Sequence, residues 1–207
     1  MLKLRSATAI IAIVTVAVSA VAILGGVNYW AVFAGFIPAR LSGIVELSGA
    51  LPAWITPLSS ALIHGGWVHL GVNMLMLAFA GSMVERVIGG GGLVLAYVVG
   101  AIIAALAQFL YDPSSPIPMI GASGAISALF GLYALFFGAP KQITGNQKLN
   151  RWIHAVWVLA AWVVLQWMAG MLAGAGGVML ATPAHIGGFV AGLLLQRPLL
   201  LWRYRKA

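Results

Sequence analysis

The sequence predicts an all-α polytopic membrane protein: a bundle of six transmembrane helices with a large interfacial first outer loop. Composition is the first reason, because 62% of the 207 residues are hydrophobic, 7% are charged and the mean hydropathy is +1.05. A soluble domain with a hydrated surface does not have such a composition. The second reason is that the apolar residues form runs long enough to cross roughly 30 Å of hydrocarbon. We expect a single membrane domain over residues 1-207.

Six apolar runs meet the length needed for a membrane-spanning helix. They cover residues 7-25, 66-84, 91-110, 121-138, 152-172 and 184-202. The first run also resembles a secretory signal peptide, because Val18-Ser19-Ala20 has the form of a cleavage site. We expect a retained helix instead, since the run from Ala7 to Ala22 is long for a signal peptide and apolar residues continue beyond it.

The segment 37-63 is also apolar, but it does not fit a membrane span. Prolines and charged residues interrupt it at Pro38, Arg40, Glu46, Pro52 and Pro57. In lipid these interruptions would leave backbone groups without hydrogen bonds. The segment is therefore expected to be an interfacial loop that contains short helices.

The distribution of basic residues predicts the orientation. With the N-terminus inside, only Arg40 lies outside, and the inner segments contain Lys3, Arg5, Arg86, Lys141, Lys148, Arg151, Arg197, Arg203, Arg205 and Lys206. The net charge of +8 thus indicates topology and contact with the lipid bilayer, and we expect no nucleic-acid partner. The expected location is the bacterial inner (cytoplasmic) membrane, with both termini cytoplasmic.

This topology gathers polar residues at the outer ends of the second, fourth and sixth spans. They are His64, His69, Asn73, Ser123 and His185, whereas His154 starts the fifth span on the cytoplasmic side. A hydroxyl and an imidazole at one depth in lipid are costly unless they pair. Ser123 and His185 therefore predict an intramembrane serine hydrolase whose site faces the periplasmic or outer side.

Small residues follow both members of this pair at helical spacing. Ser123, Ser127 and Gly131 form one stripe, and His185 begins another that continues through Gly188 and Gly192. Such stripes let two helix backbones come close, which a Ser-His hydrogen bond between helices requires. The alternative is that the glycines only pack the helices together.

The second span supplies further donors. His69 and Asn73 are four residues apart and therefore lie on one helix face, where both can donate to a developing oxyanion. The backbone N-H of Ser123, at the positive end of its helix, can join them. The alternative for Asn73 is a hydrogen bond between helices.

Taken together, these motifs resemble those of the rhomboid intramembrane serine proteases. The similar segments are HGGWVHLGVN from His64 to Asn73, Gly121-Ala122-Ser123-Gly124, and Ala184-His185-Ile186-Gly187-Gly188 with Gly192. Glu85 followed by Gly89 also fits the family pattern. The similarity covers about residues 50-195 and agrees with a six-helix core.

The resemblance implies a role for each matching residue. Ser123 would be the nucleophile and His185 the general base and acid of a Ser-His dyad, with no cofactor and no metal. His69, Asn73 and the Ser123 amide would form the oxyanion hole. His64, Gly121, Gly124 and Ser127 would have supporting roles. The implied substrates are single-span membrane proteins, cleaved near the outer end of the transmembrane segment; no oligomeric state is implied.

The chain departs from the family pattern at Ser127. Many members carry an aromatic residue one turn after the nucleophile, where it stacks on the catalytic histidine. In this chain a serine hydroxyl could hydrogen-bond His185, or packing alone could orient the imidazole. The eight tryptophans, several of them near span ends, are expected to be interfacial anchors.

Two rival functions remain open. One is a rhomboid-like protein without protease activity that binds transmembrane helices. The other is a transporter or metalloenzyme in which His64, His69 and His185 bind a metal, since three histidines can bind zinc. The absence of cysteine excludes thiolate catalysis and disulfides. The glycine-rich segment from Gly170 to Pro183 is expected to be either a mobile cap over the site or a simple connector.

Overall fold

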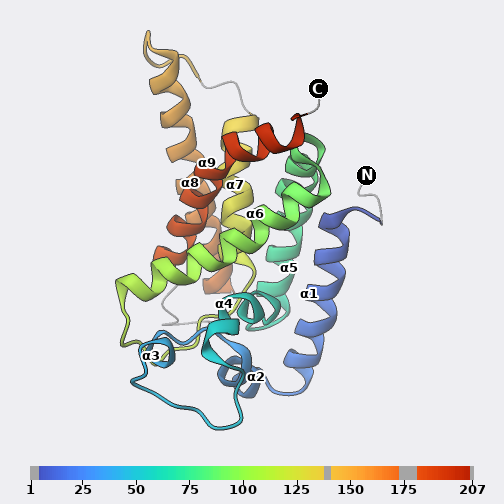
Figure 1. The fold of residues 1–207 in the computed structure, drawn as a ribbon, viewed down its shortest axis with the longest axis vertical. Helices are drawn as coiled ribbons and strands as arrows, with labels where there is room; N and C mark the ends of the chain where they lie inside the picture. Colours follow the sequence, from blue (N-terminus) through green and yellow to red (C-terminus); the bar gives the residue numbers. More distant parts are fainter. Residues whose placement is uncertain (1–4, 138–140, 173–180, 206–207) are drawn as a thin grey trace.

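The computed structural model describes residues 5–137, 141–172 and 181–205, and it is predominantly helical, as predicted (Figure 1). In these ranges the only extended pairing is an isolated bridge between Phe36 and Met119. The main helices are α1 (Ala7–Leu24), α2 (Val27–Ala34), α3 (Pro38–Leu41), α4 (Thr56–Ser59), α5 (Trp67–Met76), α6 (Ser82–Tyr111), α7 (Ser123–Phe136), α8 (Gln147–Leu172) and α9 (Thr182–Arg203). Shorter turns of 3-10 helix cover Ala53–Ile55 and Ser60–Leu62, and a π-helical turn covers Leu77–Gly81.

The short helices gather at one end of the molecule. Figure 1 shows α2, α3 and α4 together at the end opposite to both described chain ends. The segment 37-63 thus contains short helical pieces joined by irregular chain. Of the glycine-rich segment from Gly170 to Pro183, residues 173–180 lie outside the described part of the chain.

Three described helical stretches are long and apolar enough to cross a membrane. They are Ala7–Leu24, the 45-residue stretch Trp67–Tyr111 and Thr182–Arg203, while α7 is a shorter apolar helix. Many large apolar side chains on these helices face outward, among them Ile13, Leu75, Leu110 and Leu194. Outward apolar side chains over such helices match lipid as the surrounding medium, and the protein is an integral membrane protein.

The stretch Trp67–Tyr111 changes direction at Gly89. This residue has φ of 76° and ψ of 169°, a conformation that glycine adopts readily and other residues do not. The break separates the regions expected as the second and third spans. The guanidinium of Arg203 packs beside it, since a Cβ added at Gly89 would lie 3.3 Å from that group.

Helices α6, α7 and α9 form the core through close contact of small residues. A Cβ added at Gly188 or Gly192 of α9 would collide with the carbonyl oxygen of Gly124 or Ala128 on α7. A Cβ at Gly131 would likewise collide with the carbonyl oxygen of Phe189. The glycine stripes on α7 and α9 therefore bring the two backbones into direct contact. This contact brings the first turns of the two helices side by side.

Helix α1 is attached to the rest of the bundle by polar contacts at both ends. At its start, the carboxylate of Glu85 accepts hydrogen bonds from the N-H groups of Ala7 (2.8 Å) and Thr8 (3.0 Å). Near its other end, the Ser19 hydroxyl donates to the carbonyl of Leu62 at 2.7 Å. These contacts satisfy backbone groups that lipid cannot satisfy.

The prediction that the tryptophans are interfacial anchors is wrong for Trp162. Trp162 lies in the middle of α8 and is 2% exposed, whereas Trp157 on the same helix is 68% exposed. The reason is that the Trp162 indole N-H has a buried partner, the Ser127 hydroxyl, at 2.7 Å. An indole whose N-H is satisfied inside the bundle has no need of the membrane interface.

Candidate active site

Ser123 and His185 are hydrogen-bonded to each other. Oγ of Ser123 lies 2.8 Å from Nε2 of His185, and the two side chains are 8% and 3% exposed. Ser123 is the first residue of α7, and His185 lies in the first turn of α9. The glycine contact between α7 and α9 allows this approach across a sequence separation of 62 residues. A hydroxyl bonded to an imidazole is the arrangement of a nucleophile with its base.

No carboxylate orients the His185 ring. Nδ1 of His185 is buried and has no hydrogen-bond partner among the described residues. The chain has three acidic residues, and all are placed elsewhere. Glu85 caps α1, Asp112 accepts hydrogen bonds from Ser114, and Glu46 is an exposed residue of the loop after α3. The His185 ring therefore has no acidic partner in the described part of the chain.

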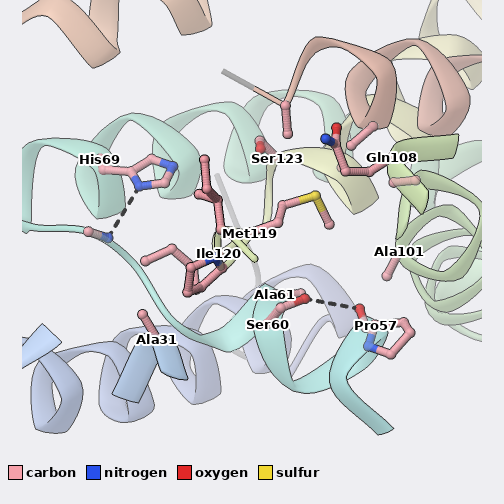
Figure 2. Close-up of a pocket in the computed structure, with 18 of the residues that line it drawn as sticks. Ala31, Pro57, Ser60, Ala61, His69, Ala101, Gln108, Met119, Ile120 and Ser123 are labelled. Carbon is pink, nitrogen blue, oxygen red and sulfur yellow. Dashed lines mark hydrogen bonds between the residues drawn. The ribbon is translucent and has the colours of Figure 1, made fainter. Parts of the chain in front are cut away.

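His69 directs a nitrogen toward the turn before Ser123. Its Nδ1 accepts the N-H of Gly65 at 3.3 Å (Figure 2), so neutral His69 has its proton on Nε2. That nitrogen lies beside Gly121, because a Cβ added at Gly121 would be 2.9 Å from Nε2 and Cε1 of His69. Gly121 also has φ of 122°. Both its conformation and the nearby ring thus require glycine here.

Asn73 lies on the same face of α5 but behind the wall of the site. Its side chain is fully buried, and Nδ2 donates to the carbonyl oxygen of His69 at 2.9 Å. Its Oδ1 has no partner among the described residues. One hydrogen of the amide remains available after the bond to His69. Asn73 therefore fixes the backbone at His69, and it does not line the cavity described below.

His64 is turned away from Ser123. Its Nε2 accepts the N-H of Ala122 at 3.3 Å, which leaves the ring proton on Nδ1. Nδ1 then donates to the Ser19 hydroxyl at 2.8 Å. The rings of His64 and His69 are 5.0 Å apart and edge to face. His64 thus connects α1 to the turn before Ser123.

The histidines do not assemble into a metal site. Among residues 5–137, 141–172 and 181–205, no three His, Asp or Glu side chains come together as metal ligands would. The fourth histidine, His154 on α8, does not line the cavity beside Ser123 that is described next.

A cavity of about 590 Å³ opens beside the Ser123–His185 pair. Figure 2 shows His69 and Ser123 on its wall, with Met119 and Ile120 between them and Gln108 of α6 to one side. Gly121, Gly124 and His185 also line the cavity, as does the buried Gln166 of α8. The wall is apolar with a few polar groups near Ser123, which is typical of sites that bind organic ligands or peptides.

Ser127 does not contact His185 through a hydrogen bond. Its hydroxyl donates to the carbonyl of Ser123 at 2.7 Å and accepts the N-H of Trp162 at 2.7 Å. Neither the contact of Trp162 nor that of Ser19 was predicted from the sequence. The place of Trp162 in the middle of an apolar run distinguishes it from interfacial tryptophans, whereas Ser19 is marked only as a polar residue in an apolar helix.

Comparison with known proteins identifies the family to which the chain belongs. The family model of the rhomboid domain matches residues 52–202. Rhomboid protease GluP of Bacillus subtilis is 38% identical over 78 residues, which are 38% of this chain and 15% of that protein. RHOMBOID-like protein 4 of Arabidopsis thaliana is 35% identical over 150 residues, 70% of this chain and 34% of that protein. Rhomboid-type serine protease 2 of Emericella nidulans is 28% identical over 153 residues, 74% of this chain and 28% of that protein.

The matched regions thus cover about a third or less of these three relatives' lengths. The family match itself extends over most of this chain, from the segment before α4 to the last turn of α9. It includes Ser123, His185 and the other residues that line the cavity, except Val27, Asn28, Ala31 and Val32 of α2. The chain belongs to the rhomboid family.

Proposed function

We propose that this protein is an intramembrane serine endopeptidase that cleaves transmembrane segments of single-span membrane proteins. The observation that carries the proposal is the 2.8 Å hydrogen bond between Ser123 Oγ and His185 Nε2 beside a cavity. The printed names of relatives in Bacillus and Emericella, a rhomboid protease and a rhomboid-type serine protease, support the same activity.

The chemistry begins with attack by Ser123. Oγ adds to the scissile carbonyl carbon while its proton passes to Nε2 of His185. The resulting oxyanion accepts hydrogen bonds from Nε2-H of His69 and from the backbone N-H of Ser123, an amide of the first helical turn with no partner inside the helix. His185 then gives its proton to the leaving amine. Water, activated by the same imidazole, hydrolyses the acyl-enzyme and restores Ser123.

The substrate has to be locally extended at the cut. In a helix each carbonyl accepts a hydrogen bond from an amide four residues on, which hides it from the nucleophile. Single-span proteins with small or helix-destabilising residues near the outer end of the span meet this requirement most easily. The cavity extends from Ser123 to α2 and α6, so the unwound segment has a wall to lie against.

The proposed orientation places the site toward the outer or periplasmic side of a bacterial inner membrane. The excess of Lys and Arg in the segments on the side of the chain ends supports cytoplasmic termini. Ser123 and His185 lie in the first turns of α7 and α9. The helices α2 and α4, which help line the cavity, lie at the end of the molecule opposite to the chain ends (Figure 1).

Labelling with a fluorophosphonate probe in detergent tests the proposal. We expect the wild-type protein to be labelled, and Ser123→Ala and His185→Ala to be unlabelled. Ser42→Ala is the matched control, because it removes an exposed hydroxyl that bonds to the carbonyl of Pro113, and it should label normally. Labelling of Ser123→Ala would place the nucleophile elsewhere.

Cleavage of a reconstituted single-span protein is the second measurement. Wild type should cut it near the outer end of the span, and Ser123→Ala should not. An unlabelled wild-type protein that still binds single-span proteins would instead support the rival function, a rhomboid-like protein that binds helices without cutting them.

A further inference from the structure

The imidazole of His185 needs an orienting group that the dyad itself does not supply. Its Nε2 bonds to Ser123, but its buried Nδ1 has no hydrogen-bond partner among the described residues. None of the three carboxylates is near it. A ring with one hydrogen bond can still rotate about that contact, so packing has to fix its plane.

Trp162 supplies such packing from a third helix. The centroids of the Trp162 and His185 rings are 6.4 Å apart, and the ring planes meet at 66°. This edge-to-face geometry falls within the range in which aromatic rings attract each other. Among the ring contacts of the described residues, this is the one that His185 makes.

The Trp162 indole is itself fixed on two further sides. Its ring stacks on Phe130, with centroids 4.5 Å apart and planes at 22°. Its N-H donates to Ser127, and the Ser127 hydroxyl in turn donates to the carbonyl of Ser123. The contacts therefore form a closed path from the backbone of Ser123 through Ser127 and Trp162 to the ring of His185.

We propose that Trp162 is a positioning residue that sets the orientation of the His185 imidazole, with Ser127 fixing the indole through its hydroxyl. This inference rests on the proposed function, because it assigns a partner to the general base of that reaction. The bulk of the indole keeps Nε2 directed at Ser123.

Ser127 has a defined part in this arrangement. It lies one helical turn after Ser123, is fully buried, and uses both its donor and its acceptor capacity. A serine at this position leaves room for the indole of α8 beside His185 and offers an acceptor for its N-H. The aromatic ring and its anchor therefore come from different helices.

A set of variants in detergent tests the proposal, with kcat and KM for a single-span substrate and the rate of fluorophosphonate labelling as readouts. Trp162→Leu should lower kcat and the labelling rate by about tenfold or more, with KM changed by less than about twofold, because only the base is displaced. Trp162→Phe should restore most of this loss, since it keeps a flat aromatic ring beside His185, which leucine lacks. Trp157→Leu, on the exposed side of the same helix, is the matched control and should change neither rate.

The hydrogen bond to Ser127 is tested by a double-variant cycle. Trp162→Phe and Ser127→Ala each remove the same N-H to hydroxyl bond, so the double variant should be no slower than the slower single variant. If the double variant instead loses activity by the product of the two single losses, the role given to Ser127 is overturned. If Trp162→Leu has the same kcat and labelling rate as wild type and only a lower unfolding temperature, Trp162 contributes to core packing alone and the proposal is overturned.

Failure of the underlying function gives a different result. In that case wild type is neither labelled nor active, or Ser123→Ala remains labelled. If Trp162→Leu does not fold, Trp162→Phe, Ser127→Ala and the double variant replace it, because these substitutions leave a ring in place. Rates equal to wild type in all three would then overturn the proposal.

Discussion

The hydroxyl of Ser19 lies 2.8 Å from Nδ1 of His64, and this contact joins the first helix to the turn before Ser123. The backbone N-H of Ala122 can only donate, so His64 accepts at Nε2 and donates at Nδ1 to Ser19. Ser19 then donates to the carbonyl of Leu62. The donor and the acceptor of each of these three hydrogen bonds are therefore fixed. Through them, α1 helps to set the position of Ala122.

Replacing Ser19 by Ala should weaken both the fold and the site. The substitution leaves Nδ1-H of His64 and the carbonyl of Leu62 buried without partners, at a cost of about 1–3 kcal/mol. We expect a lower unfolding temperature and a several-fold slower fluorophosphonate labelling rate, since Ala122 precedes Ser123, the proposed nucleophile. The control is Ser82→Ala, which removes a half-buried hydroxyl bonded only three residues away, to the carbonyl of Phe79 in the π-helical turn. If both variants behave alike, the Ser19–His64 contact has no special role.

The two predicted oxyanion donors should differ in their effect on turnover. His69 lines the cavity with Nε2-H free to donate, so His69→Ala should lower kcat by about 100-fold with little change in KM. Asn73 lies behind the wall and already donates to the carbonyl of His69, so Asn73→Ala should cost only about tenfold. Turnover of a single-span substrate measures both. The reverse order would mean that the Asn73 amide reaches the oxyanion directly.

Close packing of α7 and α9 should be a condition for the dyad. A Cβ at Gly192 would meet the carbonyl oxygen of Ala128, so Gly192→Ala forces the two backbones apart. We expect a loss of about 1–3 kcal/mol in stability and a reduced labelling rate, because Ser123 and His185 separate with the helices. Gly71→Ala on α5 is the control, since a Cβ there meets nothing within 4 Å. Normal labelling of a folded Gly192→Ala would show that the dyad tolerates the separation.

Much of this site could be predicted from local sequence. Helices impose patterns on any sequence: apolar length, four-residue periodicity and stripes of small residues such as those on α7 and α9. From these patterns Ser123 and His185 could be paired. The same patterns predicted that His69 and Asn73 share a helix face. They did not predict that His69 lines the cavity while Asn73 lies behind it, because that depends on the rotation of α5 against its neighbours.

The contacts made by Trp162 and Ser19 could not be predicted in this way. Each depends on where a helix distant in the sequence packs, and neither residue belongs to a spacing pattern. Tryptophan in a membrane protein generally favours the interface, and a buried acceptor such as the Ser127 hydroxyl reverses that preference. The break at Gly89 could be predicted only in part. A run of glycines marks the region, but the sequence does not show that Gly89 is the one with the positive φ.

Glu85 should stabilise the fold without affecting the chemistry. Its carboxylate accepts the N-H groups of Ala7 and Thr8, which are first-turn amides of α1 with no partner inside that helix. Its negative charge also lies at the positive end of the α1 dipole. Glu85→Ala should therefore lower stability by about 1–2 kcal/mol. Thermal unfolding in detergent measures the loss.

The labelling rate of Glu85→Ala well below its unfolding temperature should equal that of wild type. The cap lies at the N-terminal end of α1, while the short helices that help line the cavity lie at the opposite end of the molecule (Figure 1). Glu46→Ala is the matched control, because it removes the same charge from an exposed loop position and should leave both stability and labelling unchanged. An equal fall in stability for both variants would assign the effect to net charge. A slower labelling rate for Glu85→Ala alone would mean that the position of α1 is transmitted to Ser123, and the contact between Ser19 and His64 is the route by which it would travel.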